Sequence, residues 1–296
     1  IHRTLQVVPG VIAEGEVRTE AVTVATVQTL VRLEPDRFGD IARRFGCVIL
    51  DESHHCPAST FQTVVSRIPA KYRFGLTATP ERADGLTPLI GFTFGPSLFE
   101  ISYAQLVAGG WLNAPVVREV RTAFAFDWQG PEDLHRLMDA LAADAERNRL
   151  MVDLTIAEVR AGHAVLALSE RVEHCRLLAE GVRSQGVCAE ALVGTLPKEK
   201  RRAILDDFRD GSLPVVVATT LADEGLDVPR LDRVLLAWPG RAKGRATQRL
   251  GRIMRPCPGK GQAVLIDIVD ADVPVLKRRH AERRKAYASL GLGGAP

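Results

Sequence analysis

Short runs of β-branched and other apolar residues recur along the chain, and turn-forming residues bound each run. They are VTVATV (22–27), CVILDE (47–52), RFGLTAT (73–79), AVLALS (164–169), PVVVATT (214–220), RVLLAW (233–238) and AVLIDIV (263–269). Such runs are typical of parallel strands that are buried on both faces. Helical apolar spacing occupies segments between them, at 58–67, 171–185, 197–209 and 243–254. The alternation predicts an α/β fold built from two doubly wound parallel sheets.

The alternation of predicted strands and helices stops between Pro80 and Pro131, where the sequence is rich in glycine and aromatic residues. A long polar helix is expected to follow over residues 131–160, and a basic helical stretch near the end covers 277–285. We therefore place the boundary between the lobes near 120–145. The predicted organisation is a first lobe at 1–120, a linker at 121–145 and a second lobe at 146–296.

Composition limits the class of protein. The 296 residues are 46% hydrophobic and 25% charged, as in globular proteins. No apolar stretch approaches the ~18 residues that cross a bilayer, and the start has no signal pattern, so we expect a cytoplasmic protein with no membrane partner. The five cysteines are scattered and indicate neither a disulfide framework nor a thiolate metal site.

The charge is distributed unevenly between the two halves of the chain. Residues 1–140 carry 13 Lys and Arg against 16 Asp and Glu, whereas residues 141–296 carry 26 against 20. A basic half suggests a polyanionic partner such as nucleic acid, although a basic surface also serves solubility alone.

The strand CVIL runs directly into Asp51-Glu52-Ser53-His54. The carboxyl end of a strand is where an open α/β sheet presents groups to a ligand. One carboxylate there can hold Mg²⁺, and the next can orient and deprotonate a water molecule for phosphoryl transfer. Taken alone, Asp51 and Glu52 are better explained as a polar strand end with a satisfied histidine, and the motifs elsewhere in the chain overturn that reading.

Four motifs together resemble the DExH branch of the superfamily 2 helicases and translocases. D-E-S-H is similar to motif II, and the Q-x-x-G-R-x-x-R pattern is similar to motif VI. The four segments are 51–54 (motif II), 76–80 (motif III), 218–220 with 224–229 (motif V) and 248–255 (motif VI). The resemblance covers nearly the whole chain, implies RecA-like lobes, and is nearest to repair-type DNA translocases and restriction-enzyme motor subunits.

The resemblance implies a role for each matching residue, with ATP and Mg²⁺ as cofactors. Asp51 would position Mg²⁺, and Glu52 would be the general base. Arg252 and Arg255 would be arginine fingers. Gln248, Gly225 and Asp227 would bind the nucleotide. His54, Thr77 and Thr79 would be the coupling residues. Positions 248, 252 and 255 would share one face of a helix. A merely solvated basic face is the alternative.

Nucleic acid, expected to be double-stranded DNA, would be held through its phosphates. The candidates lie at turns or strand ends: Thr26, Gln28, Thr195 and Thr219. Each is also explained as a helix cap or a strand residue. The cluster His54-His55-Cys56 is a poor zinc site, because adjacent residues rarely converge on one ion.

The phosphate-binding pattern G-x-x-x-x-G-K-[ST] does not occur in the chain, and Pro258-Gly259-Lys260-Gly261 does not fit it. We therefore expect the first lobe to be incomplete, the parent protein to be longer, and the chain alone to lack ATPase activity. The predicted function of the parent protein is an ATP-dependent DNA helicase or translocase, with a nuclease or other subunit as a possible partner. The alternatives are a catalytically inactive nucleic-acid-binding or scaffold module and a nucleotide-binding enzyme unrelated to nucleic acid.

Overall fold

The computed structural model describes residues 5–56, 59–78, 85–113, 115–219, 228–240, 256–257 and 259–289. It divides into two compact units, residues 1–100 and residues 101–296. The division falls ahead of the linker expected at 121–145. Strand β6 (Val116–Arg121), which the sequence placed in the first lobe, pairs in parallel with β11 (Val264–Val269) and is part of the second unit.

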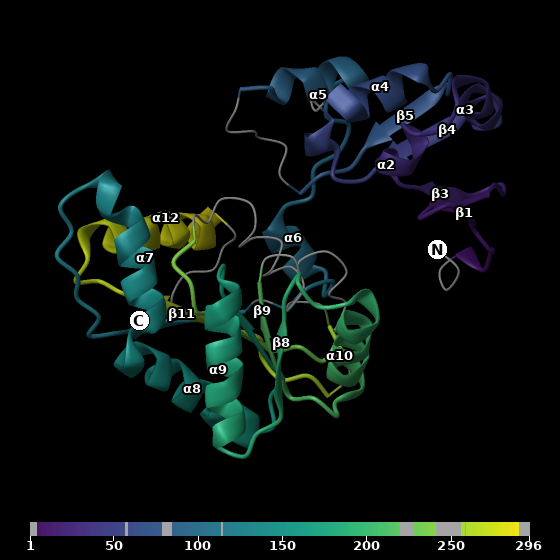
Figure 1. Ribbon diagram of the computed structural model, residues 1–296. Coiled ribbons are helices and arrows are strands. Elements are labelled where there is room, and N and C mark those ends of the chain that lie inside the picture. The colour runs from purple at the N-terminus through teal and green to yellow at the C-terminus, as the bar shows by residue number, and fades with distance from the viewer. Residues whose placement is uncertain are drawn as a thin grey trace. The chain divides into compact units, whose positions relative to one another are not determined.

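The first unit contains two small sheets with short helices around them (Figure 1). In one sheet, β1 pairs antiparallel with β2 and parallel with β3, and in the other β4 pairs in parallel with β5. The strands are β1 (Gly10–Ala13), β2 (Glu16–Arg18), β3 (Thr23–Ala25), β4 (Cys47–Leu50) and β5 (Tyr72–Gly75). The helices are α2 (Val27–Leu30), α3 (Pro35–Ala42), η1 (Ser53–His55), α4 (Ser59–Arg67) and α5 (Thr87–Phe94).

The sequence predicted that the strands of this unit are buried, and for β3, β4 and β5 that prediction was wrong. Ile49 of β4 is 63% exposed, and Phe74 of β5 and Leu76 just after it are also exposed. Each of these strands has only one neighbouring strand among the described residues. The apolar side chains that a larger doubly wound sheet would bury therefore stay accessible.

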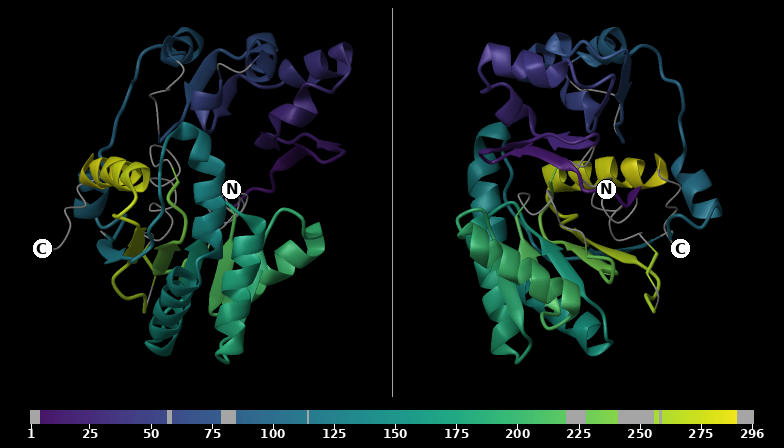
Figure 2. Two further views of the ribbon diagram at one scale, coloured as in Figure 1. Left: turned by 60° about the vertical axis from the view of Figure 1, so that its left-hand side comes forward. Right: turned by 90° about the vertical axis from the view of Figure 1, so that its right-hand side faces the viewer.

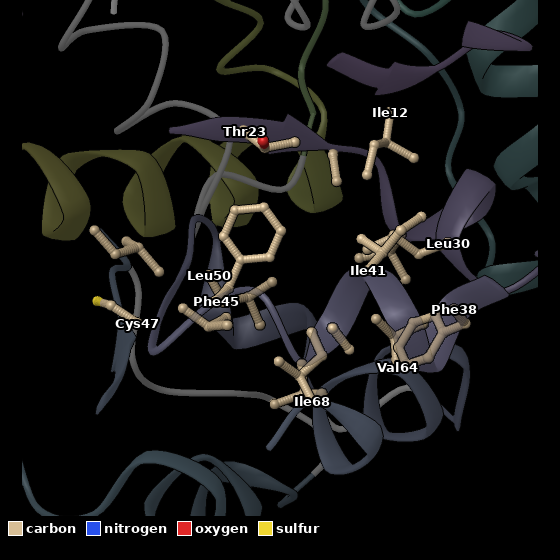
Figure 3. Close-up of a pocket in the computed structure, with 16 residues that line it drawn as sticks. Ile12, Thr23, Leu30, Phe38, Ile41, Phe45, Cys47, Leu50, Val64 and Ile68 are labelled. Atoms are coloured by element: carbon tan, nitrogen blue, oxygen red, sulfur yellow. The ribbon is translucent and has the colours of Figure 1, made fainter. Parts of the chain in front are cut away.

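A cavity of about 160 Å³ lies in the first unit between β3 and β4 (Figure 3). Its walls are apolar: Ile12, Leu30, Phe38 and Ile41 face it, with Leu50 on the opposite side. Ligand pockets usually measure about 300–1,000 Å³ and carry convergent polar groups. The cavity is too small and too apolar to bind a nucleoside triphosphate.

The second unit is built on a six-stranded parallel sheet in the order β6-β11-β10-β7-β9-β8. Its further strands are β7 (Val165–Leu168), β8 (Ala189–Leu192), β9 (Val215–Ala218) and β10 (Arg233–Leu236). The helices are α6 (Tyr103–Ala108), η2 (Pro131–Asp133), α7 (Leu134–Ala143), α8 (Ala145–Arg160), α9 (Val172–Ser184), α10 (Lys198–Asp210) and α12 (Pro274–Ser289).

Helices cover both faces of this sheet (Figures 1 and 2). Successive strand residues point to opposite faces, so Leu166 packs with Phe208 of α10 whereas Val165 packs with Met151 of α8 and Leu178 of α9. Strands β7, β9 and β10 are buried throughout. The predicted α/β fold with doubly wound parallel sheets is confirmed.

Two helices, α7 and α8, replace the single long helix expected over 131–160. The chain is extended at Asp144, whose carboxylate accepts a hydrogen bond of 2.7 Å from the backbone N–H of Arg147. Aspartate is a favourable N-cap, so Asp144 ends one helix and starts the next. Within the described residues, no helix is long and apolar enough to cross a membrane.

The basic stretch 277–285 lies in α12, and one of its cations faces inward. The Arg283 guanidinium donates to both carboxylate oxygens of Asp267 in β11, at 2.8–3.1 Å, and the Tyr287 hydroxyl donates to the same carboxylate at 2.9 Å. Asp267 is fully buried. This cluster joins α12 to the sheet. The Arg283 side chain therefore stabilises the fold and is not available to bind a polyanion.

Candidate functional site

The parallel pair β4 and β5 determines where the candidate catalytic residues lie. Cys47 is in register with Tyr72, and Leu50 with Gly75, so the two strands end at the same edge. Asp51 and Glu52 follow β4 directly. Thr77 follows β5 by two residues. Motif II and motif III are therefore adjacent because their strands are adjacent.

The turn after β4 is held tightly. Glu52 has φ 51° and ψ 47°, the left-handed conformation that non-glycine residues rarely adopt. The Asp51 carboxylate accepts a hydrogen bond of 2.9 Å from the Glu52 N–H, and the Ser53 N–H donates to the carbonyl of Leu76 at 2.8 Å. Such conformations cost roughly 1–3 kcal/mol, and they concentrate at functional sites.

His54 connects the two motifs through a single ring nitrogen. Its Nδ1 lies 3.0 Å from Thr77 Oγ1 and 3.3 Å from Glu52 Oε2. The His54 side chain is mostly buried, whereas the Glu52 side chain is 46% exposed. The carboxylate therefore reaches solvent on one side and contacts the imidazole on the other. The structure thus brings together Glu52, His54 and Thr77, with Asp51 exposed next to them.

Gly75 is a site residue that the sequence reasoning missed. A Cβ atom there would lie 2.9 Å from both Cβ and Oγ of Ser53 and 3.0 Å from Cδ2 of Phe94. Ser53 is buried, and its N–H donates to the carbonyl of Leu76, the residue after Gly75. Only glycine lets the end of β5 approach the Asp51-Glu52 turn this closely. The available signal was a glycine at the carboxyl end of an apolar strand.

Two nucleic-acid candidates, Thr26 and Gln28, lie where β3 ends and α2 begins, and both are exposed. The Thr26 N–H donates to the carbonyl of Ile12 at 3.0 Å, and its hydroxyl donates to Thr29 Oγ1 at 2.8 Å. The Thr26 side chain makes no capping hydrogen bond to the helix backbone. Thr26 therefore occupies the N-cap position of α2 without a side-chain cap, and its role in binding stays a prediction.

The other two candidates follow neighbouring strands of the second unit. Leu192 of β8 is in register with Ala218 of β9, so Thr195 and Thr219 lie beyond the same sheet edge. Thr195 is exposed and its Oγ1 is 3.4 Å from Arg176 Nη2. Thr219 is 5% exposed, and its hydroxyl has no hydrogen-bond partner within the part of the chain that the structure describes.

Several predicted site residues lie outside the described residues: Thr79, Gly225, Asp227, Gln248, Arg252 and Arg255. Their roles stay predictions. Among the described residues, no group of three or more His, Cys, Asp or Glu side chains could hold a metal ion. A single exposed carboxylate such as Asp51 nevertheless fits Mg²⁺, because this ion keeps several water ligands and needs only one or two protein carboxylates.

Two protein families match the chain, one in each unit. Residues 6–82 match the family described as "Type III restriction enzyme, res subunit", and residues 146–257 match "Helicase conserved C-terminal domain". The first match contains motifs II and III, and the second contains motifs V and VI. The chain belongs to the superfamily 2 helicases and translocases.

Curated relatives agree with this family, and a solved structure agrees with the fold. The "DNA 3'-5' translocase XPB2" of Sulfurisphaera tokodaii is 26% identical over 94% of this chain and 71% of its own length. The "DNA 3'-5' helicase XPB" of Mycobacterium tuberculosis is 27% identical over 92% of this chain and 49% of its own length. A single-substitution variant of S. cerevisiae Dbp5 bound to RNA and ADP BeF3 matches 98% of this chain and 70% of its own chain, with a TM-score of 0.67 at 15% identity.

The Dbp5 match supports the RecA-like fold of this superfamily 2 chain and nothing finer. The curated relatives are longer than the chain, which spans between 40% and 71% of their length. The family assignment therefore rests on the two domain matches and the relatives together.

The close approach at Gly75 generates a stability prediction. We expect Gly75→Ala to push Ser53 and Phe94 apart, which should weaken the β4–β5 pair by roughly 1–3 kcal/mol, the usual cost of overpacking. Hydrogen–deuterium exchange of peptides that cover β4 and β5 should then become about 5- to 100-fold faster.

Gly91→Ala is the matched control, because Gly91 lies in the adjacent helix α5 and an added Cβ there meets nothing within 4 Å. Exchange in this control should match the unsubstituted protein. Equal protection in Gly75→Ala and Gly91→Ala would contradict the packing described here.

Proposed function

We propose that this chain is the motor part of an ATP-dependent DNA helicase or translocase. The observation that carries the proposal is the turn after β4, where Glu52 in a left-handed conformation contacts His54, and His54 contacts Thr77 at the end of β5. The Glu52 carboxylate is held in a fixed place and is connected through His54 to Thr77, after the next strand. This suits a site where ATP hydrolysis at motif II must affect motif III. The names of the relatives, DNA 3'-5' translocase and DNA 3'-5' helicase, support this choice.

The chemistry assigned to the chain is phosphoryl transfer to water. Asp51 would hold Mg²⁺ through its exposed carboxylate, and the ion would supply charge neutralisation on the phosphate oxygens. Glu52 takes the proton of the water whose oxygen forms the new bond to the γ-phosphorus, while the bond to the β-phosphate oxygen breaks. ADP and phosphate are the products.

The finger role belongs to Arg252 and Arg255, with Gln248, Gly225 and Asp227 assigned to nucleotide binding. A guanidinium stabilises the charge that develops on the equatorial phosphate oxygens in the transition state. His54, Thr77 and Thr79 would pass the nucleotide state from the first unit to the bound strand. The protein would move on double-stranded DNA in the cytoplasm. A nuclease or other subunit is a candidate partner.

Contacts to the phosphates of DNA are assigned to Thr26, Gln28, Thr195 and Thr219. Three of these side chains are exposed, and the hydroxyl of Thr219 is a buried donor with no partner among the described residues. Hydroxyl and amide groups at strand ends bind the backbone rather than the bases, so they position the protein without reading sequence. Such binding suits a motor that must move over any sequence.

A catalytically inactive nucleic-acid-binding module is the second candidate. The chain has no G-x-x-x-x-G-K-[ST] sequence, so hydrolysis has to be tested on the full-length protein. The two candidates differ in ATP turnover by the full-length protein. The inactive module predicts DNA binding without hydrolysis.

The first test is to separate hydrolysis from binding in the full-length protein. Glu52→Gln should abolish steady-state ATP turnover and leave the affinity for ATP nearly unchanged, because the amide keeps the shape of the side chain but cannot take a proton. Arg255→Ala should lower turnover by roughly 10³-fold or more, as the loss of an arginine finger does.

Turnover and the dissociation constant for ATP are measured on each variant, with Glu20→Gln as the control, because Glu20 is an exposed carboxylate away from the turn. Turnover of Glu52→Gln equal to that of Glu20→Gln would remove Glu52 from the reaction.

The second test concerns the DNA-binding residues. Affinity for two unrelated duplexes should be equal within about three-fold, and it should fall at least ~10-fold between about 50 and about 200 mM salt, because phosphate binding releases counterions. Thr26→Ala should weaken binding by about 3- to 10-fold, the usual effect of one hydrogen bond.

Thr63→Ala is the control for this second test, since Thr63 is also an exposed threonine but lies on α4. Fluorescence anisotropy titrations supply the affinities. Strong preference for one duplex together with a flat salt dependence would contradict phosphate binding.

A further inference from the structure

Helix α12 is far more basic than the other described helices of the second unit. Its sequence, PVLKRRHAERRKAYAS, contains six lysine and arginine residues and a single acidic residue, Glu282. By comparison, α10 carries five basic residues against four acidic ones, and α8 carries three against three. A soluble surface ordinarily intersperses charges of both signs. The excess of positive charge on α12 therefore indicates a partner of opposite charge.

The inner face of α12 is fixed to the sheet. Arg283 and Tyr287 both donate hydrogen bonds to the buried carboxylate of Asp267 in β11. Arg279 Nη1 donates a hydrogen bond of 3.2 Å to the carbonyl of Pro239, which follows β10. Tyr287 also belongs to the apolar cluster that α10 lines, so α12 lies on the face of the sheet that α10 covers. These contacts prevent rotation of the helix, and its outer side chains keep one orientation.

Four cations share the outer face of α12: Lys277, Arg278, Arg284 and Lys285, all of them exposed. At 3.6 residues per turn they lie within an arc of about 120°, and the second pair follows the first by about 10.5 Å along the helix axis. Arg284 Nε lies 3.4 Å from Glu119 Oε1 of β6. The other three side chains make no ion pair within the described part of the chain.

The other positions on this outer face indicate which polyanion it fits. Between the cations lie Ala281 and Ala288, and this described face has no large apolar or aromatic side chain. A helix that binds a membrane surface needs apolar side chains that enter the bilayer. Proteins that hold single strands stack the bases on aromatic rings. Duplex DNA instead presents one negative charge per about 1.7 Å of its axis, which a fixed row of cations with small residues between them can approach closely.

Helix α12 also begins at the edge of the sheet where Thr219 lies. Strand β11 ends at Val269, and α12 starts at Pro274. Thr219 follows β9, which is three strands away from β11 in the same sheet. Neighbouring strands are about 4.8 Å apart, so the two positions are separated by about 15 Å along the edge. One turn of duplex DNA spans about 34 Å, so a single turn can contact both.

We propose that the outer face of α12 binds the phosphate backbone of duplex DNA through Lys277, Arg278, Arg284 and Lys285. This inference rests on the proposed function, because it extends the DNA-binding surface to a helix that none of the motifs includes. The contacts are ion pairs with phosphates, so they add affinity without reading the sequence. The inward-facing Arg283 takes no part in them.

The central test is the double variant Arg278→Gln with Lys285→Gln in the full-length protein. Each phosphate contact contributes about 0.9 to the slope of log affinity against log salt concentration, so the slope for a duplex should become about 1.8 less steep. The affinity at about 50 mM salt should fall roughly ten-fold. Fluorescence anisotropy at several salt concentrations measures both quantities.

Arg149→Gln with Arg160→Gln is the matched control. Both residues are exposed on α8, and this helix packs on the opposite face of the sheet. The control removes the same amount of charge from the protein, so it corrects for the change in net charge. Its salt slope and melting temperature should equal those of the unsubstituted protein.

A second measurement uses the unsubstituted full-length protein and does not depend on how a variant folds. Acetylation of lysine side chains is followed by mass spectrometry with and without a bound duplex. Lys277 and Lys285 should lose most of their reactivity when the duplex is bound, because their ammonium groups then contact phosphates. Lys71 is an exposed lysine at the amino end of β5 and should keep its reactivity.

The outcomes separate this inference from the proposed function. If the α12 variant and the α8 control have the same slope while the protein binds DNA, the inference is overturned and the proposed function stands. A lower affinity with an unchanged slope is a structural effect and overturns it as well. A loss that appears with single strands and not with duplexes contradicts the choice of partner. If the unsubstituted protein binds no DNA, both the inference and the proposed function fail.

Discussion

Parallel pairing of strands is the constraint on which the rest of this molecule depends. Parallel strands end at one edge of their sheet, so residues that are distant in sequence meet there without any direct attraction between them. In the first unit this places Thr77 beside the turn that carries Asp51 and Glu52. In the second unit it places Thr219, Trp238 and Asp270 at the ends of their strands along one edge.

The sequence predicted the parallel sheets well because their signal is local and strong. The strands β7, β9, β10 and β11 are continuous apolar runs, and buried parallel strands require such runs on both faces. The strands of the second unit that it missed, β6 and β8, have charged residues within them: VVREVR and AEAL. An edge strand tolerates charge on one side, so its composition does not separate it from a loop.

Contacts between remote residues were the part that the sequence could not supply. Nothing in the chain near Arg147 indicates that its partner is Asp270, because the pairing depends on how α8 packs beside β11. Gly75 was overlooked for a similar reason, since its importance lies in the distance to Ser53. The lobe boundary depended on the pairing of β6 with β11, which composition alone does not reveal. The motif pattern predicted the candidate carboxylates Asp51 and Glu52, and only the fold shows that His54 contacts both Glu52 and Thr77.

The two units thus have different characters. The second is closed on both faces and contains buried ion pairs, among them Arg283 with Asp267. The first has exposed apolar strands and a strained turn next to its candidate base. We propose that nucleic-acid binding and ATP hydrolysis are coupled through the contacts of His54 with Glu52 and Thr77. The most direct measurement is the rate of ATP turnover by the full-length protein as duplex DNA is added. The account predicts that turnover rises with DNA to a plateau, and turnover that is absent or independent of DNA would contradict it.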